Sequence, residues 1–341
     1  MLLGLTALTG LIIASLVGLF AAPLGSLFGL LDFPDDAGGR KQHARVTPLV
    51  GGLGVALASV VGVALTSAFV VQAGPSIGQH LLWLGIAIAA MFLIGLADDR
   101  FLLSPRVRLS LAMIVLLLVV ISAPDFGVSF IRFSGQPQVL LLGSGAEVFT
   151  LLCLVGLLNA INMADGKNGI VISLGLIWSA ILFFRLPPPM LPVLAAAASA
   201  LAVLLWFNMK GRLFLGDGGS YAVSALFGLL AVYAYNHGFD SVRADDIVLM
   251  FAVPVFDTIR LMIARSLQRR SPFLGDRDHL HHYLYARIGW PRGLWVYVAL
   301  VALPNAAAVA LPGTAMVWLL VSAIAYGLVL KGARRPHVLV A

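Results

Sequence analysis

Two adjacent aspartates, Asp98 and Asp99, stand between long apolar runs in the stretch GLADDRFLLSPRVRL. Adjacent carboxylates repel each other, so the pair favours a bound cation or a raised pKa. Arg106 and Arg108 follow a few residues later. Carboxylates beside arginines suit a phosphate group together with a divalent metal ion. The alternative is a solvent-exposed helix end that carries no chemistry.

A second polar stretch, NAINMADGKNG, spans residues 159–169. Asn159 and Asn162 are three residues apart and would share one face of a helix, which Asp165 extends if the helix continues. Gly166 and Gly169 then favour the end of the helix and let backbone N–H groups approach a ligand. Ordinary turn chemistry of Asn, Asp and Gly is the alternative, although five polar residues and two glycines are many for a short turn.

Asp217 and Ser220 lie where a helix is expected to begin, in the stretch FNMKGRLFLGDGGS over residues 207–220. Either residue could be a simple helix N-cap. The positive end of the helix dipole and the neighbouring glycines also favour an anion-binding site. The two interpretations are compatible.

Three histidines, His279, His281 and His282, stand with Arg277 in SPFLGDRDHLHHYL, residues 271–284. Zinc is not favoured, because positions i, i+2 and i+3 of a helix do not place all three rings on one side. An incidental polar loop is a second alternative. Arginine and histidine next to a carboxylate-rich centre suit a diphosphate, so we favour a lip that binds phosphate or sugar.

The remaining acids are interpreted without chemistry. Asp257 lies inside an apolar run, and a structural ion pair with Arg260 or Arg265 is favoured. Three acids of one connection are interpreted as a solvated loop: Asp240, Asp245 and Asp246.

The overall composition determines which elements position these residues. Of 341 residues, 60% are hydrophobic and 11% are charged, and the mean hydropathy is +1.00. Soluble domains have about 25% charged residues, so the composition excludes a soluble globular protein. It predicts one integral-membrane domain over residues 1–341, with no nucleic-acid partner. The single cysteine, Cys153, excludes an intramolecular disulfide.

Apolar runs long enough to cross a bilayer predict an all-α polytopic membrane protein with about eleven transmembrane helices. We place them near 1–22, 49–71, 80–97, 109–123, 146–161, 169–185, 190–207, 218–235, 245–265, 294–311 and 315–330. The first run has no Lys or Arg ahead of it, so a retained span is favoured over a cleaved signal peptide. Between the fourth and fifth spans, β-prone runs around residues 134–137 predict a small outer β-hairpin.

The basic residues favour one orientation of these helices. Of 22 Lys and Arg residues, three fall in the connections after even-numbered spans, and the other 19 lie in or at the opposite connections and the C-terminal tail. Because basic residues accumulate on the cytoplasmic side, the N-terminus is predicted outside and the C-terminus in the cytoplasm. The four aspartates singled out above then converge at the cytoplasmic surface, which predicts metal-dependent phosphate chemistry there.

At these motifs the sequence resembles the polyprenyl-phosphate N-acetylhexosamine-1-phosphate transferases, a membrane superfamily. Six motifs occur in the family's order: RKQHARVTPLVGGLG (40–54), LADDR (96–100), NAINMADGKNG (159–169), FLGDGGS (214–220), PVFDT (254–258) and SPFLGDRDHLHH (271–282). The last motif is most similar to bacterial enzymes of glycosyltransferase family 4 that transfer N-acetylglucosamine-1-phosphate (GlcNAc-1-phosphate) to undecaprenyl phosphate.

This resemblance implies a Mg²⁺-dependent enzyme, with Mn²⁺ as an alternative, in the bacterial inner (cytoplasmic) membrane. A UDP-N-acetylhexosamine would donate the sugar phosphate to undecaprenyl phosphate and release UMP. That step would start a lipid-linked cell-surface glycan such as lipopolysaccharide O-antigen. Membrane lipid and a second copy of the chain, in a homodimer, are the other implied partners.

The resemblance also implies roles for individual residues. Asp217 and Asn162 would bind the metal ion. The implied catalytic residues are Asp98, Asp99, Asp165 and His279, of which Asp98 and Asp99 would position or deprotonate the acceptor phosphate. The implied substrate-binding residues are Lys41, His43, Arg106, Arg108, Asn159, Asn168, Asn208, Phe214, Arg277, His281 and His282. Among these, Phe214 would stack on uracil. Arg106 and Arg108 would hold the acceptor phosphate. Arg277 and the histidines would bind the diphosphate and the sugar.

The chain departs from the family pattern at three places. Asn168 stands where relatives often have a second aspartate, which weakens any role that needs a negative charge there and leaves recognition of the sugar by the amide. The segment between Pro34 and Arg40 is longer than usual. The stretch from Asn208 to Asp217 is shorter, so Asn208 is a weaker candidate nucleotide contact than Phe214.

Three alternatives stay open. The same fold could act on another UDP-N-acetylhexosamine, carrying FucNAc, QuiNAc or GalNAc, or the chain could be a degenerate member without activity. Retention of the four aspartates and the histidines argues against the degenerate member. The third alternative is a lipid or sugar transporter. Transporters place substrate groups near the bilayer midplane, whereas these charges gather at one face, so transport is least favoured.

Overall fold

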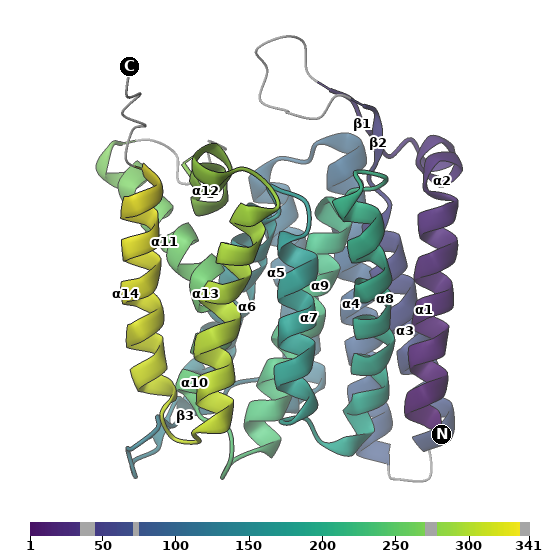
Figure 1. The fold of residues 1–341 in the computed structure, drawn as a ribbon. Coiled ribbons are helices and arrows are strands. Elements are labelled where there is room, and N and C mark those ends of the chain that lie inside the picture. The colour runs from purple at the N-terminus through teal and green to yellow at the C-terminus, as the bar shows by residue number, and fades with distance from the viewer. Residues whose placement is uncertain (35–44, 71–74, 270–277, 335–341) are drawn as a thin grey trace, which may run out of the picture.

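The computed structural model describes residues 1–34, 45–70, 75–269 and 278–334 and shows an all-α polytopic membrane protein (Figure 1). The helices are α1 (Leu2–Leu19), α2 (Ala21–Phe28), α3 (Gly51–Val70), α4 (Pro75–Phe101), α5 (Pro105–Ser122), α6 (Ala146–Ala164), α7 (Ile170–Phe183), α8 (Leu191–Met209), α9 (Gly216–His237), α10 (Ala244–Met250), α11 (Ala252–Leu267), α12 (Leu280–Ile288), α13 (Arg292–Ala310) and α14 (Ala315–Arg334). Two antiparallel strand pairs join β1 (Leu31–Asp32) to β2 (Thr47–Pro48) and β3 (Phe130–Ile131) to β4 (Leu140–Leu141). Short 3-10 turns are η2 (Pro124–Phe126), η3 (Gly143–Gly145) and η4 (Pro188–Met190).

Each of the eleven predicted spans overlaps one of these helices or the α10–α11 pair. In the described part of the chain, nine helices are long and apolar enough to cross a membrane, and the α10–α11 pair makes a tenth if it is one span. The apolar helix α7 has only 14 residues. The number of crossings therefore stays a prediction. The β3–β4 hairpin is confirmed, whereas α2, α12 and the β1–β2 pair are too short to be predicted from spanning-length runs.

The two ends of the bundle differ in what they carry. We call the end at which α4, α6, α8 and α14 finish the site end, which is the upper end in Figure 1. The opposite end, the hairpin end, carries β3 and the start of α1. The first helix thus begins at one end and the last finishes at the other, as an odd number of spans requires. The described connections that are predicted to be cytoplasmic all lie at the site end.

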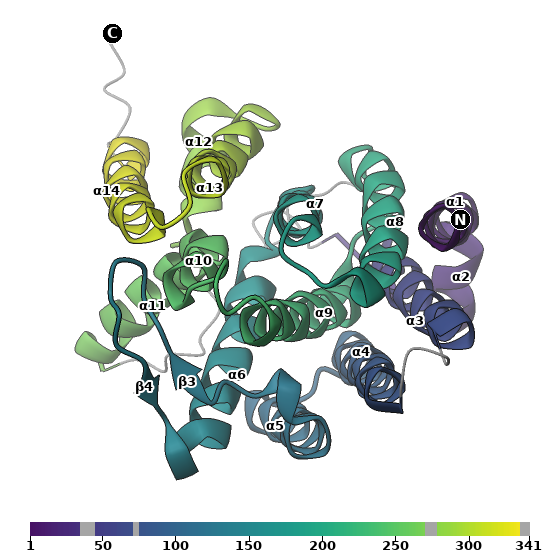
Figure 2. The same ribbon diagram turned by 90° about the horizontal axis from the view of Figure 1, so that it is seen from below.

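The central helix of the bundle is α9, which is buried from Gly218 to Tyr235 and packs against α3, α4, α6 and α7 (Figure 2). Small residues let its neighbours approach closely. A Cβ atom on Gly95 of α4 would lie 2.3 Å from the Asp217 carbonyl oxygen, and one on Gly52 of α3 would lie 2.3 Å from the Gly219 nitrogen. Only glycine fits at such distances, so these two glycines bring α3 and α4 against the start of α9.

The helices α10 and α11 meet at Phe251 with a bend of 76°. A sharp bend frees backbone carbonyls from their helical partners. The Trp178 indole N–H donates to the Met250 carbonyl at 2.8 Å, and the Asn305 amide donates to the Leu249 carbonyl at 3.2 Å. The bend is therefore held by side chains of α7 and α13.

The predicted solvated loop at the hairpin end is wrong for two of its three acids. Asp245 and Asp246, at the start of α10, are 0% and 6% exposed. Asp246 accepts a hydrogen bond from Arg185 at 2.8 Å, and Asp245 accepts the Ser134 backbone N–H at 2.8 Å. These partners are 61 and 111 residues away in the sequence, so only the fold removes the two acids from water. The Asp240 side chain is 98% exposed, as predicted.

Candidate active site

Asp217 lies in the first turn of α9 and faces α6. Its Oδ1 accepts a hydrogen bond from the Asn162 amide at 2.6 Å, and the same amide donates to Ser220 Oγ at 3.1 Å. The N-cap residue of α9 is Leu215, whose apolar side chain makes no capping hydrogen bond. The simple N-cap interpretation of Asp217 and Ser220 is therefore wrong. The two residues predicted to bind a metal ion are thus in direct contact between α6 and α9.

Asp99, at the end of α4, holds the start of α9. Its two carboxylate oxygens accept the backbone N–H groups of Asp217 and Gly218, both at 3.0 Å. Gly216 has a φ of +74°, a conformation that favours glycine, and a Cβ atom there would lie 2.7 Å from Asp99 Oδ2. Asp99 therefore acts on the backbone that carries Asp217, and Gly216 leaves room for it.

Asp98 is the more buried of the adjacent pair, with 4% of its surface exposed, so a solvated helix end is wrong for it. Arg108, near the start of α5, donates to Asp98 at 2.7 Å and lies 3.9 Å from Asp217 Oδ2. The Asp98 and Asp217 carboxyl groups are themselves within hydrogen-bonding reach. Arg106 is exposed at the same helix start. Because a guanidinium has five N–H donors, Arg108 can bind a phosphate while it holds these acids.

Asp165 follows α6 as its C-cap residue, one turn beyond Asn162. Burial, and then the charge of Asp217, raise the pKa of Asp165 to about 7. Such a shift is typical of carboxyl groups at functional sites. Asn159 lies one turn earlier in α6 and donates back to the Val155 carbonyl at 2.9 Å. The predicted stripe thus holds for Asn162 and Asp165, while the Asn159 amide is bonded within its own helix.

Asn208 links the two loops that flank the site. It is buried, its Oδ1 accepts the Gly169 N–H at 2.6 Å, and its Nδ2 donates to the Leu213 carbonyl at 3.0 Å. These bonds support a structural role, and a nucleotide contact of Asn208 stays a prediction. Phe214 is partly buried beside it, and its backbone N–H donates to the Pro48 carbonyl at 2.8 Å.

The histidines lie at the start of α12, over the 165–169 connection. The His279 and His281 rings stack with centroids 5.4 Å apart. A Cβ atom on Gly166 would lie 2.1 Å from His281 Nε2, so this ring sits against the backbone next to Asp165. His281 is 1% exposed, and within the described ranges neither of its ring nitrogens has a hydrogen-bond partner. Burial, and then the charges of His282 and His279, lower the pKa of His281 well below its usual value.

Further contacts join α12 and the turn that follows it to the same connection. The Trp290 indole N–H donates to the Asn168 carbonyl at 2.9 Å. The Lys167 ammonium lies 3.9 Å from the centre of the Tyr285 ring. The histidines are therefore held in a fixed relation to Asp165.

The structure brings most of the predicted site residues together. The four aspartates meet with Asn162 and Arg108, and the histidines lie beside Asp165. Three predicted residues, Lys41, His43 and Arg277, lie outside the described part of the chain. The sequence patterns did not indicate the Ser220 contact with Asn162. They also did not indicate a contact between Asp257 and His279. A buried acid in a span is a signal for function, but Arg260 nearby in the sequence explained Asp257 equally well.

The donor set suits a divalent metal ion. The four carboxylates of the site outnumber its one guanidinium, that of Arg108. Two carboxylates as close as those of Asp98 and Asp217 repel each other, and a bound cation stabilises them. Among the residues that the structure describes, no three His, Cys, Asp or Glu side chains enclose a metal ion by themselves. Mg²⁺ needs no such cage, because it binds through one or two carboxylates and takes waters and phosphate oxygens as further ligands. A half-turn of the Asn162 amide would offer its oxygen to the ion.

Comparisons with known proteins point to one family. The sequence profile of glycosyl transferase family 4 matches residues 81–235. The chain is 30% identical over 316 residues to the undecaprenyl-phosphate alpha-N-acetylglucosaminyl 1-phosphate transferase of Yersinia pestis. The matched region covers 87% of this chain and 81% of that protein. It is 29% identical over 293 residues to the probable undecaprenyl-phosphate N-acetylglucosaminyl 1-phosphate transferase of Bacillus subtilis, covering 82% and 75%. It is 28% identical over 315 residues to the decaprenyl-phosphate N-acetylglucosaminephosphotransferase of Mycolicibacterium smegmatis, covering 83% and 75%.

Proposed function

Because the chain belongs to glycosyl transferase family 4, we propose that it transfers GlcNAc-1-phosphate from UDP-GlcNAc to undecaprenyl phosphate and releases UMP. The observation that carries the proposal is the meeting of Asp98, Asp217 and Arg108 at the start of the buried helix α9. Its bacterial relatives bear the name of this transfer. We place the enzyme in a bacterial cytoplasmic membrane, and the excess of basic residues supports a site end that faces the cytoplasm.

In the proposed reaction, an oxygen of undecaprenyl phosphate attacks the β-phosphorus of UDP-GlcNAc. A bond forms between that oxygen and the β-phosphorus, the bond from the β-phosphorus to the bridging oxygen breaks, and UMP leaves with the bridging oxygen. The attacking phosphate is already anionic near neutral pH, so it requires no strong general base. We therefore favour a single displacement over an aspartyl-phosphate intermediate.

The residues of the site divide this work. Asp217 and Asn162 would bind Mg²⁺, or Mn²⁺ in its place, and the bound ion would neutralise the donor diphosphate and the leaving UMP. Asp99 orients Asp217 through the backbone. Asp98 and Arg108 are placed to position the acceptor phosphate, with Asp165 and the α12 histidines facing the sugar diphosphate.

The direct test uses the purified protein in lipid nanodiscs with undecaprenyl phosphate and radiolabelled UDP-GlcNAc. We expect a labelled lipid and an equimolar amount of UMP, both dependent on the lipid phosphate. Labelled UMP should also exchange into UDP-GlcNAc through the reverse reaction. A panel of UDP-GalNAc, UDP-FucNAc and UDP-QuiNAc then identifies the preferred sugar. Absence of lipid-phosphate-dependent turnover with every one of these donors would overturn the proposal.

A further inference from the structure

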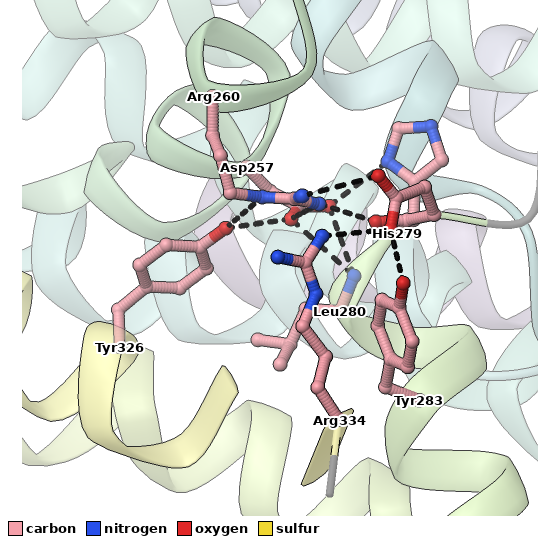
Figure 3. Close-up of polar contacts among 8 residues, drawn as sticks. Asp257, Arg260, His279, Leu280, Tyr283, Tyr326 and Arg334 are labelled. Atoms are coloured by element: carbon pink, nitrogen blue, oxygen red, sulfur yellow. Dashed lines mark hydrogen bonds and ion pairs between the residues drawn. The ribbon is translucent and has the colours of Figure 1, made fainter. Parts of the chain in front are cut away.

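Asp257 of α11 is a buried carboxylate at the centre of a group of polar contacts that involves α11, α12 and α14 (Figure 3). It is 3% exposed. Its Oδ2 accepts a hydrogen bond from His279 Nδ1 at 2.9 Å, and its Oδ1 accepts the Tyr326 hydroxyl at 2.7 Å and the Arg260 guanidinium at 2.9 Å. Both oxygens also lie 3.2–3.3 Å from the Leu280 backbone nitrogen. The ion pair with Arg260, one of the two partners predicted for Asp257, covers only part of these contacts.

The bond to His279 determines how that ring is used. An ionised carboxylate only accepts hydrogen bonds, so Nδ1 must carry the proton that is shared with Asp257. The other ring nitrogen, Nε2, is then the atom left to meet a ligand. The bond from the Leu280 N–H satisfies a backbone group at the first residue of α12, where a helix lacks internal partners. One carboxylate therefore fixes both the histidine and the helix that follows it.

A second set of contacts holds the same segment from α14. The Arg334 guanidinium donates to the Asp278 carboxylate at 2.7 Å. The Tyr283 hydroxyl donates to the same carboxylate, and Arg260 donates to the Asp278 carbonyl. The residue before His279 is thus tied to both α11 and α14. Little freedom is left for the start of α12 to shift relative to Asp257.

This arrangement reaches the site through the stacked histidine rings. His279 stacks on His281, and His281 rests against the Gly166 backbone beside Asp165. A rotation of the His279 ring would therefore disturb the side of the site that faces the sugar diphosphate.

We propose that Asp257 is a positioning residue for the transfer reaction, which holds the His279 ring through Nδ1 so that Nε2 meets the donor diphosphate. This inference rests on the proposed function. The competing explanation is that Asp257 only ties α11, α12 and α14 together. The two explanations differ in whether an Asp257 substitution still matters once His279 is gone.

A double-mutant cycle on kcat separates them. We expect Asp257→Asn to lower kcat about 10- to 100-fold, the loss found when the partner that orients a metal-bound histidine is removed. His279→Gln should lower kcat at least as much, because it removes the ring itself. The double variant should be no slower than His279→Gln alone, because Asp257 acts through that ring. Losses that multiply in the double variant, or wild-type kcat in Asp257→Asn, would overturn the proposal. Asp246→Asn is the matched control. It also neutralises a buried carboxylate, but at the hairpin end and away from His279, so it should leave kcat unchanged.

A spectroscopic measurement decides the matter if Asp257→Asn does not fold. Solid-state ¹⁵N NMR of histidine-labelled wild-type protein in lipid, with His279→Gln to identify the signals, reports which ring nitrogen of His279 carries hydrogen. We expect a protonated Nδ1, and a ring protonated only at Nε2 would overturn the proposal. Wild-type turnover tests the proposed function separately, because the NMR result stands whether or not any UDP-sugar is used.

Discussion

The Asp99 carboxylate accepts the backbone N–H of Asp217 at 3.0 Å and so joins the end of α4 to the first turn of α9. Asp99 is thereby engaged with the protein, whereas the Asp217 side chain faces Asn162 and Arg108. Two aspartates of the same cluster have different tasks: one sets the backbone and the other presents its carboxylate. Substitutions can separate these tasks.

Asp217→Asn removes the charge that we assign to the metal ion while nearly preserving the size of the side chain. We expect kcat to fall at least about 100-fold, as when one group that stabilises developing charge is lost. Asp98→Ala should abolish turnover as well, because Arg108 loses its nearest acid. Steady-state kinetics on the purified variants checks both.

The control for Asp217→Asn is again Asp246→Asn. It leaves Arg185 without its partner, so unfolding should become easier by about 3–5 kcal/mol with kcat per folded molecule unchanged. Full activity in Asp217→Asn would remove the metal assignment.

Removal of divalent cations should stop the reaction reversibly. We expect EDTA to abolish turnover and Mg²⁺ or Mn²⁺ to restore it. Mg²⁺ should also raise the thermal midpoint of the wild-type protein, because a ligand of the folded state stabilises it. The same addition should leave the midpoint of Asp217→Asn unchanged. An equal rise in both proteins would place the ion elsewhere.

Gly216→Ala tests the space that Asp99 needs. Gly216 and Gly211 both have positive φ, at +74° and +63°, so alanine costs about 1–2 kcal/mol of backbone strain at either position. A Cβ atom on Gly216 would also meet Asp99 Oδ2 at 2.7 Å, whereas one on Gly211 meets nothing within 4 Å. We therefore expect Gly216→Ala to lower kcat strongly and Gly211→Ala to keep it. Equal kcat in the two variants would contradict the role given to Asp99.

Asp165 should make stability depend on pH in the metal-free protein. Its pKa is about 7 in the folded state and about 3.9 in an unfolded chain. The free energy of unfolding therefore falls as pH rises from about 4 to 7, because in this range the unfolded chain loses the proton and the folded chain keeps it. Asp165→Asn cannot ionise. Its thermal midpoint in EDTA should exceed that of the wild type at pH 8, and the difference should shrink toward pH 5. A constant difference would contradict the raised pKa.

The sequence predicts the helices and the site end well, because bilayer thickness fixes the length of a span and charge is costly in lipid. It predicts the bend between α10 and α11 poorly, since the apolar run is continuous there and the freed carbonyls are bonded by Trp178 and Asn305 from distant helices. The burial of Asp246 fails for the same reason, because Arg185 is 61 residues away. Contacts between such distant residues leave no local pattern.

The burial of α9 from Gly218 to Tyr235 bears on how the protein is made. Among the nine spanning helices in the described ranges, α9 has the lowest mean hydropathy, and alone in a bilayer it would expose Asp217 and its other polar groups to hydrocarbon. Four of its neighbours, α3, α4, α6 and α7, precede it in the chain. During synthesis these helices are already in the membrane when α9 emerges, so they can shield it as it inserts. The order of the helices along the chain thus lets a polar helix enter the membrane among partners made before it.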